Sequence, residues 1–131
     1  MRWHSGCGPA IAAVFAILGS VTTMAAPTAG APSFGRQVQR IFYRHCTECH
    51  SPGHVGYQAI SLDLTTYRGV RNGSERGVVV IPRHPQRSLI MRVLDWKAGS
   101  DEIKMPPLGP QLSREDRDVI RAWIAAGAKD D

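Results

Sequence analysis

Residues 46–50 read CTECH, which places Cys46 and Cys49 two residues apart and His50 directly after the second cysteine. Thiolates and imidazole are zinc ligands, two neighbouring thiols can cycle as a dithiol, and the same three side chains can anchor a covalent haem. The residues on either side of this stretch decide among these three kinds of site.

The zinc and dithiol interpretations find little support nearby. A structural zinc site needs four ligands, and no second cysteine pair follows, so His54 or His84 would have to help complete it. A reactive dithiol lies at the start of a helix that follows a strand, whereas Cys46 ends a helical pattern. The haem interpretation uses every residue: Cys46 and Cys49 form thioethers, and His50 binds iron.

The helical pattern before CTECH covers residues 34–46. Its apolar side chains recur at the i, i+4, i+7 and i+8 spacing of one helix face: Phe34, Val38, Ile41 and Phe42. Ser33 is suited to cap this helix at its N-terminus.

The chain after CTECH alternates between loops and helical patterns. Residues 51–56 (SPGHVG) are expected to form a loop, and residues 60–73 extended chain or a short helical turn. Residues 84–96 predict a second helix, with Pro85 at its first position and an apolar face of Leu89, Ile90, Val93 and Leu94. Residues 112–128 predict a last helix, which Ser113 caps and Gly127 ends, with a buried face of Val119, Ile120, Trp123 and Ile124.

A proline-rich loop with the sequence KMPP separates the last two helices. Pro106 and Pro107 fix φ and remove two backbone donors, so they hold the chain extended beside Met105. Such a loop can press the thioether of Met105 against the second face of a haem iron. Met91 lies in an aliphatic run and is expected to pack in the core. His84, His54, Met91 or an open position stay as alternatives to Met105.

The N-terminus has the pattern of a secretory signal. One firm positive charge at Arg2 precedes an apolar stretch at residues 10–18 and small residues at 25–26. We expect a signal peptide at residues 1–25, with an uncleaved anchor as the alternative. A flexible linker at 26–33 (APTAGAPS) and one domain at 34–131 follow. The localisation is then periplasmic or otherwise exported, and no later segment is long enough to span a membrane.

The charge is moderately basic. The formal net charge is +5 for the full chain, and Arg residues outnumber Lys. An exported protein rarely meets nucleic acid, and the basic residues form no dense run, so we expect no nucleic-acid binding. The charge favours docking to redox protein partners with an acidic surface, or solubility alone. The oligomeric state does not follow from the sequence.

Four stretches together resemble a known family: IFYRHCTECHSPG, LDLTTYRGV, IPRHPQRSLIMRV and MPPLGPQLSREDRDVIRAWIAAGA. They resemble the planctomycete-type cytochrome c domain of the class I c-type cytochrome superfamily, over about residues 34–128. The resemblance implies an all-α, cytochrome c-like fold in which N- and C-terminal helices cross around one covalent haem c. Cys46 and Cys49 would attach the haem, and His50 and Met105 would bind its iron. Gly35 would let two backbones approach closely.

One segment departs from the family pattern. Where the family usually resembles VPGDPEKS, Arg83 and His84 replace a glycine and an acidic helix cap, so we expect a change in the local turn. Arg83 or Arg76 could pair with a haem propionate, and Trp96 or Tyr67 could donate to one. The ordinary alternatives are solvated arginines and core aromatics with one wet edge.

These features predict an exported monohaem c-type cytochrome that transfers single electrons by Fe(III)/Fe(II) cycling with His/Met ligation. No acid, base or nucleophile constellation is visible, so we expect an electron carrier rather than an enzyme, either alone or as an electron-transfer subunit of an oxidoreductase. The alternative is a haem-based ligand-binding sensor or enzyme subunit with a displaceable sixth ligand.

Overall fold

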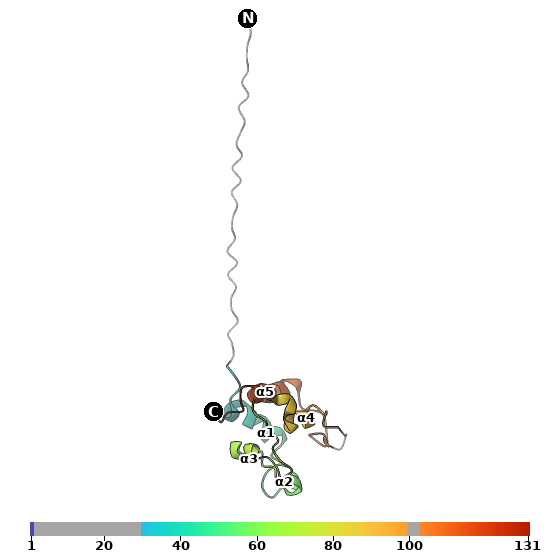
Figure 1. Ribbon diagram of the computed structural model, residues 1–131. Coiled ribbons are helices and arrows are strands. Elements are labelled where there is room, and N and C mark those ends of the chain that lie inside the picture. The colour runs from blue at the N-terminus through green and yellow to red at the C-terminus, as the bar shows by residue number, and fades with distance from the viewer. Residues whose placement is uncertain (2–29, 100–102) are drawn as a thin grey trace.

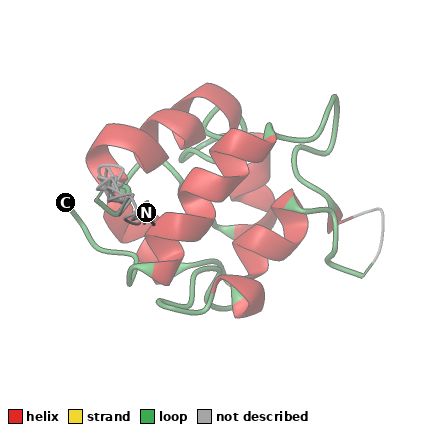
Figure 2. Ribbon diagram, turned by 90° about the horizontal axis from the view of Figure 1, so that it is seen from above, coloured by secondary structure: helices red, strands yellow, loops and turns green. Residues whose placement is uncertain are grey.

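The computed structural model describes residues 1, 30–99 and 103–131 (Figure 1). The predicted signal peptide and most of the predicted linker therefore lie outside the described residues. Within the described ranges the chain forms helices and loops and no strand, which confirms an all-α domain (Figure 2). None of the helices in this part of the chain is long and apolar enough to cross a membrane.

The helical elements are short and follow the chain as a π-helical turn, α-helices and one 3₁₀ turn. In order they are η1 (Phe34–Val38), α1 (Gln39–His45), α2 (Val55–Ile60), α3 (Tyr67–Asn72), η2 (Pro85–Arg87), α4 (Leu89–Leu94) and α5 (Arg114–Ala125). In Figure 1, α4 and α5 lie at one end of the domain, α2 and α3 at the other, and α1 between them.

The two ends of the domain pack against each other. The Phe34 ring lies 5.5 Å from that of Trp123, between centroids, and 5.2 Å from that of Tyr67. Ser33 caps η1 as predicted, since its side chain accepts from the backbone N–H of Arg36. The N–H of Gly35 donates to the backbone oxygen of Asp131 at 3.0 Å.

The backbone that lies close to Gly35 is therefore that of Asp131. A Cβ at this position would lie 3.5 Å from the backbone oxygen of Asp131, which is an ordinary contact. The space around Gly35 does not require a glycine.

The structure differs from the predicted loop at residues 51–56 in its last two residues. Val55 and Gly56 belong to α2 rather than to a loop, because the N–H of Gln58 donates to the His54 carbonyl at 2.9 Å and closes a helical turn over them. Within residues 60–73 the expected short helical turn is present as α3 (residues 67–72), which Thr66 caps by accepting from the N–H of Gly69.

The predicted helix at 84–96 is divided at Ser88. Pro85 begins a 3₁₀ turn as expected, but Ser88 is extended, and its buried hydroxyl accepts from the N–H of Ile81 and donates to the His84 carbonyl. Helix α4 therefore begins at Leu89 rather than continuing from Pro85. The Leu89 side chain, which was expected on the apolar face, is exposed. Met91 is buried instead, which agrees with its expected packing role.

Helices α4 and α5 end in the same hydrogen-bonding pattern, the Schellman motif. At α5, Gly127 has φ +111°, and the N–H of Ala128 donates to the Trp123 carbonyl at 2.9 Å. At α4 the equivalent left-handed residue is Trp96, with φ +57°, and the N–H of Lys97 donates to the Arg92 carbonyl at 2.7 Å.

Arg83 also adopts a left-handed backbone, with φ +65°. Its N–H donates to the Ile124 carbonyl at 2.7 Å, which ties this turn to α5. The local turn thus places an arginine in a backbone conformation that glycine favours.

Candidate haem site

The CTECH segment closes the end of α1 as a tight turn. Cys46 is the C-cap of α1, and its carbonyl accepts from the N–H groups of Cys49 at 3.1 Å and His50 at 2.8 Å. Both cysteines are half-buried and free of any disulfide. The two thiols and the imidazole are thereby held in one turn, as covalent attachment to a single porphyrin requires.

The environment of Cys46 does not suit dithiol chemistry. Burial, with a further contribution from the neighbouring Cys49, raises the pKa of the Cys46 thiol to about 12. Reactive cysteines have a lowered thiol pKa. Cys46 is therefore not suited to act as the reactive thiolate of a thiol oxidoreductase.

His50 is only 8% exposed, and its Nδ1 atom is buried without a hydrogen-bond partner. Burial lowers the pKa of the imidazole, and the nearby backbone carbonyl of Leu62 opposes this shift. A neutral imidazole has a lone pair on one ring nitrogen, which is what a metal ligand needs. An unpartnered buried ring nitrogen is uncommon. Because Nδ1 lies against Gly56, a haem iron would be held by the other ring nitrogen, Nε2.

Gly56 forms one wall of the space around His50. A Cβ at Gly56 would lie 2.9 Å from the Cys49 carbonyl oxygen, 3.0 Å from His50 Cε1 and 3.1 Å from His50 Nδ1. The distance to the Cys49 oxygen is one that real Cβ atoms essentially never show, and the two distances to His50 are tighter than most Cβ contacts. The absence of a side chain at residue 56 therefore lets α2 approach the imidazole closely. Sequence reasoning assigned Gly56 to a loop and missed this role.

Met105 lies beside the C-terminal end of α4, and its side chain is half-buried against the core. Its N–H donates to the Val93 carbonyl at 3.1 Å, and its carbonyl accepts from the indole Nε1 of Trp96 at 3.1 Å. The Met105–Pro106 peptide bond is cis. Both backbone polar groups of Met105, the predicted sixth ligand, are therefore hydrogen-bonded, the N–H to Val93 and the carbonyl to Trp96.

The alternative ligands are placed less favourably. His54 and His84 are exposed, and the ring of His54 bonds to the Glu48 carbonyl at 2.7 Å. Across residues 30–99 and 103–131, no three histidine, cysteine or carboxylate side chains gather into a group that could hold a metal ion. The zinc interpretation gains no further ligand.

The suggested propionate donors are engaged elsewhere. Tyr67 donates its hydroxyl to the Ala128 carbonyl at 2.9 Å, and Trp96 donates to Met105. Their hydrogen bonds are therefore internal to the protein rather than directed at a haem propionate.

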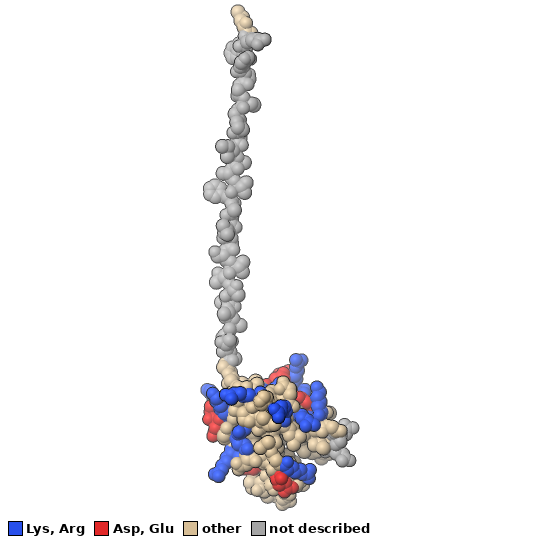
Figure 3. All heavy atoms as spheres, viewed as in Figure 1, with Lys and Arg blue, Asp and Glu red and all other residues tan. Residues whose placement is uncertain are grey.

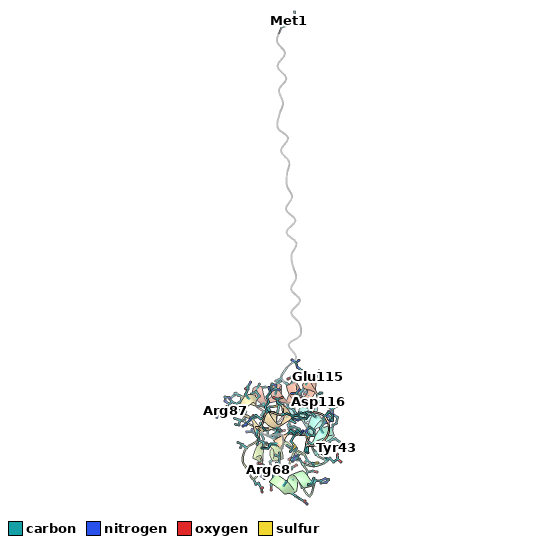
Figure 4. All side chains as sticks on the ribbon, turned by 90° about the vertical axis from the view of Figure 1, so that its right-hand side faces the viewer. Met1, Tyr43, Arg68, Arg87, Glu115 and Asp116 are labelled. Atoms are coloured by element: carbon teal, nitrogen blue, oxygen red, sulfur yellow. The ribbon has the colours of Figure 1, made fainter. Side chains whose placement is uncertain are left out.

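A surface groove of about 940 Å³ runs along α1 toward the start of α5. Thr47 and Ser51 line it, whereas Cys46, Cys49, His50 and Met105 do not. The groove therefore lies along another side of the CTECH turn from the predicted ligands. Tyr43 and Asp116, which also line the groove, lie on the same side of the domain in Figure 4.

A C-x-x-C-H turn that closes a helix in an all-α domain is typical of the c-type cytochromes. Comparison with protein families agrees: residues 46–109, from CTECH through the KMPP loop, match the family described as Planctomycete cytochrome C. This match supports a planctomycete-type cytochrome c domain at residues 46–109 of the chain. This family implies a covalently bound haem, for which the free cysteines and His50 are suited. No curated protein and no solved structure matches the chain.

Proposed function

We propose that the protein is an exported monohaem c-type cytochrome that passes single electrons between redox partners. The observation that supports this most directly is the CTECH turn, in which two free cysteines precede the buried imidazole of His50. Haem, when bound, supplies the Fe(III)/Fe(II) couple. The protein contributes thioether anchors from Cys46 and Cys49, a ligand from His50, and an apolar surrounding that excludes water.

Met105 is the proposed sixth ligand. Its backbone is hydrogen-bonded to Val93 and Trp96, and its side chain turns partly into the core, which suits a thioether held with little freedom. In the proposed cytochrome c-like arrangement, the η1–α1 and α5 helices cross. The contact between Phe34 and Trp123 supports this arrangement.

The proposed partner has an acidic docking surface. Arg36, Arg40 and Arg44 recur at i, i+4 and i+8 along η1 and α1, all three are exposed, and they line the surface groove. Arg44 pairs with Asp116 at 3.3 Å, whereas Arg36 and Arg40 form no ion pair with a described carboxylate. Figure 3 shows basic side chains over much of the visible surface, so the proposal concerns this row and not a single dense patch.

Oxidised and reduced visible spectra of the protein, made in a host that attaches haem covalently, test the proposal. One haem per chain, retained after denaturation and lost in Cys46→Ala/Cys49→Ala, is the expected result. Slow, weak binding of carbon monoxide to the ferrous protein supports an electron carrier. Tight and fast binding at neutral pH would instead establish the alternative, a sensor or enzyme subunit with a displaceable ligand. A mass lacking residues 1–25 is expected for the exported protein.

Docking has a separate test. Arg40→Gln should slow electron transfer to an acidic redox protein at low salt, because steering by charge is screened as ionic strength rises. Arg87→Gln is the matched control, since Arg87 lies on the opposite side of the domain from Tyr43 in Figure 4. Equal effects of the two variants would contradict docking at the η1–α1 row.

A further inference from the structure

Trp96 occupies a backbone position that disfavours it. It is the left-handed residue of the Schellman motif that ends α4, with φ +57°, whereas Gly127 occupies the equivalent position at the end of α5. Glycine is the usual residue there because a Cβ strains the left-handed conformation. Strained residues that persist are often found at functional sites, and the observed strain is a reason to examine what the side chain contacts.

Burial does not account for the tryptophan, because the residue is 41% exposed. Its contacts are instead with the loop that carries Met105. The indole Nε1 donates to the Met105 carbonyl at 3.1 Å, and Lys104 Nζ lies 5.1 Å from the centroid of the indole ring. Both contacts are made to consecutive residues of the KMPP loop, one by hydrogen bonding and one by cation–π attraction.

The backbone next to Trp96 is held against α5 by ion pairs of Asp95. Asp95, directly before Trp96, accepts from Arg117 Nη1 at 2.8 Å and from Arg121 Nη2 at 3.0 Å. On the far side of the loop, Gln111 Nε2 donates to the Leu94 carbonyl at 2.9 Å. The indole therefore extends from the C-terminal end of α4 onto the KMPP loop. The residues that follow this loop are hydrogen-bonded to the same end of α4, through Gln111.

The consequence for Met105 is that both of its backbone polar groups are engaged, with the N–H bonded to Val93 and the carbonyl to Trp96. Withdrawal of the loop from the core has to break the indole hydrogen bond. We propose that Trp96 is a positioning residue that holds the Met105 thioether at the iron and slows its release. This inference rests on the proposed ligation by Met105.

The test is the rate at which imidazole replaces the native sixth ligand in the ferric protein. Trp96→Phe keeps an aromatic ring and the left-handed strain but loses the N–H donor. We expect it to exchange about fivefold faster, the factor that corresponds to one net hydrogen bond. Trp96→Gly relieves the strain, so it should be at least as stable as the wild type and yet exchange at least as fast as Trp96→Phe. Amide hydrogen exchange at Met105 should rise in both variants.

Tyr67→Phe is the matched control, because it also removes one hydrogen bond from an aromatic side chain to a backbone carbonyl, at Ala128 and not in the Met105 loop. Its imidazole replacement rate should equal that of the wild type. Both Trp96 variants could replace the sixth ligand by imidazole at the wild-type rate while keeping the long-wavelength ferric absorption of sulfur ligation. That result would overturn the role of Trp96 but not the ligation by Met105. If Met105→Ala leaves that absorption and the exchange rate unchanged, the ligation by Met105 fails as well, and this inference fails with it.

Discussion

Substitution of Gly56 by alanine gives a direct test of how His50 is held. A Cβ at this position would lie 2.9 Å from a backbone oxygen of Cys49 and about 3 Å from two atoms of the His50 ring. The backbone oxygen cannot rotate away, so either α2 or the imidazole has to move. Overpacking of this kind costs about 1–3 kcal/mol.

A helical glycine replaced by alanine also gains about 1 kcal/mol from helix propensity. For Gly56→Ala the two effects oppose each other, and we expect a net loss of about 0–2 kcal/mol in the free energy of unfolding. Gly35→Ala is the matched control, because Gly35 is also helical and its Cβ would meet only one atom, at 3.5 Å. That variant should be as stable as the wild type or more stable.

The assay is denaturant unfolding of the haem-loaded protein. Midpoints of the two variants are compared only if their m-values are equal, because a shift in midpoint then reports a change in stability. Gly56→Ala should unfold at a lower denaturant concentration than Gly35→Ala. Its ferric spectrum should also change, because a displaced imidazole would alter the proposed ligation by His50. If Gly56→Ala is as stable as Gly35→Ala and keeps the wild-type spectrum, the approach of α2 does not position His50.

Three further perturbations test separate parts of the structure. Arg83→Gly should raise the free energy of unfolding by about 0.5–1 kcal/mol, because it removes left-handed strain, whereas Arg83→Ala should not. Asp95→Asn should lower that free energy by about 2 kcal/mol at neutral pH, measured by denaturant unfolding, since it weakens charged hydrogen bonds from Arg117 and Arg121. Met105→Ala should leave haem attached but lower the midpoint potential in a redox titration; an unchanged midpoint would exclude Met105 as the ligand.

The acid dependence of the Asp95 effect follows from its pKa. Burial alone would raise the pKa of this carboxyl, but hydrogen bonds and charge from Arg121 and Arg117 together outweigh burial and hold the pKa below its usual range. The folded-state pKa is lowered, so the stabilisation is present above the ordinary carboxyl pKa and is lost as the pH falls through the folded value. The stability difference between wild type and Asp95→Asn should therefore shrink in acid. A constant difference down to low pH would contradict this account.

The ends of the domain were the easiest part to predict from the sequence. Ser33, Ser113 and Gly127 are cap residues whose side chain or lack of one has a local role, and the structure confirms all three. The apolar faces at Val38 and Ile120 follow from a repeat within a single helix. Such signals depend on neighbours a few residues away and so can be recognised without the fold.

The details around the site depend on contacts between distant segments. Gly56 looks like a loop glycine until the carbonyl of Cys49 and the ring of His50 are known to lie against it. Trp96 looks like a core aromatic with a wet edge until its backbone angle and its bond to Met105 are seen. The division of the helix at Ser88 likewise depends on hydrogen bonds to Ile81 and His84 that no periodicity reveals.

The hydrogen bonds between η1 and Asp131 determine how the domain can be joined to other chains. The hydroxyl of Ser33 and the N–H of Gly35 both donate to the backbone oxygen of Asp131, and the N–H of Phe34 donates to its side chain. The polypeptide therefore enters and leaves the folded unit at nearly the same point. A unit of this kind can be inserted into a surface loop of a host protein without forcing the two halves of the host apart, so the domain is suited to serve as an insertable module.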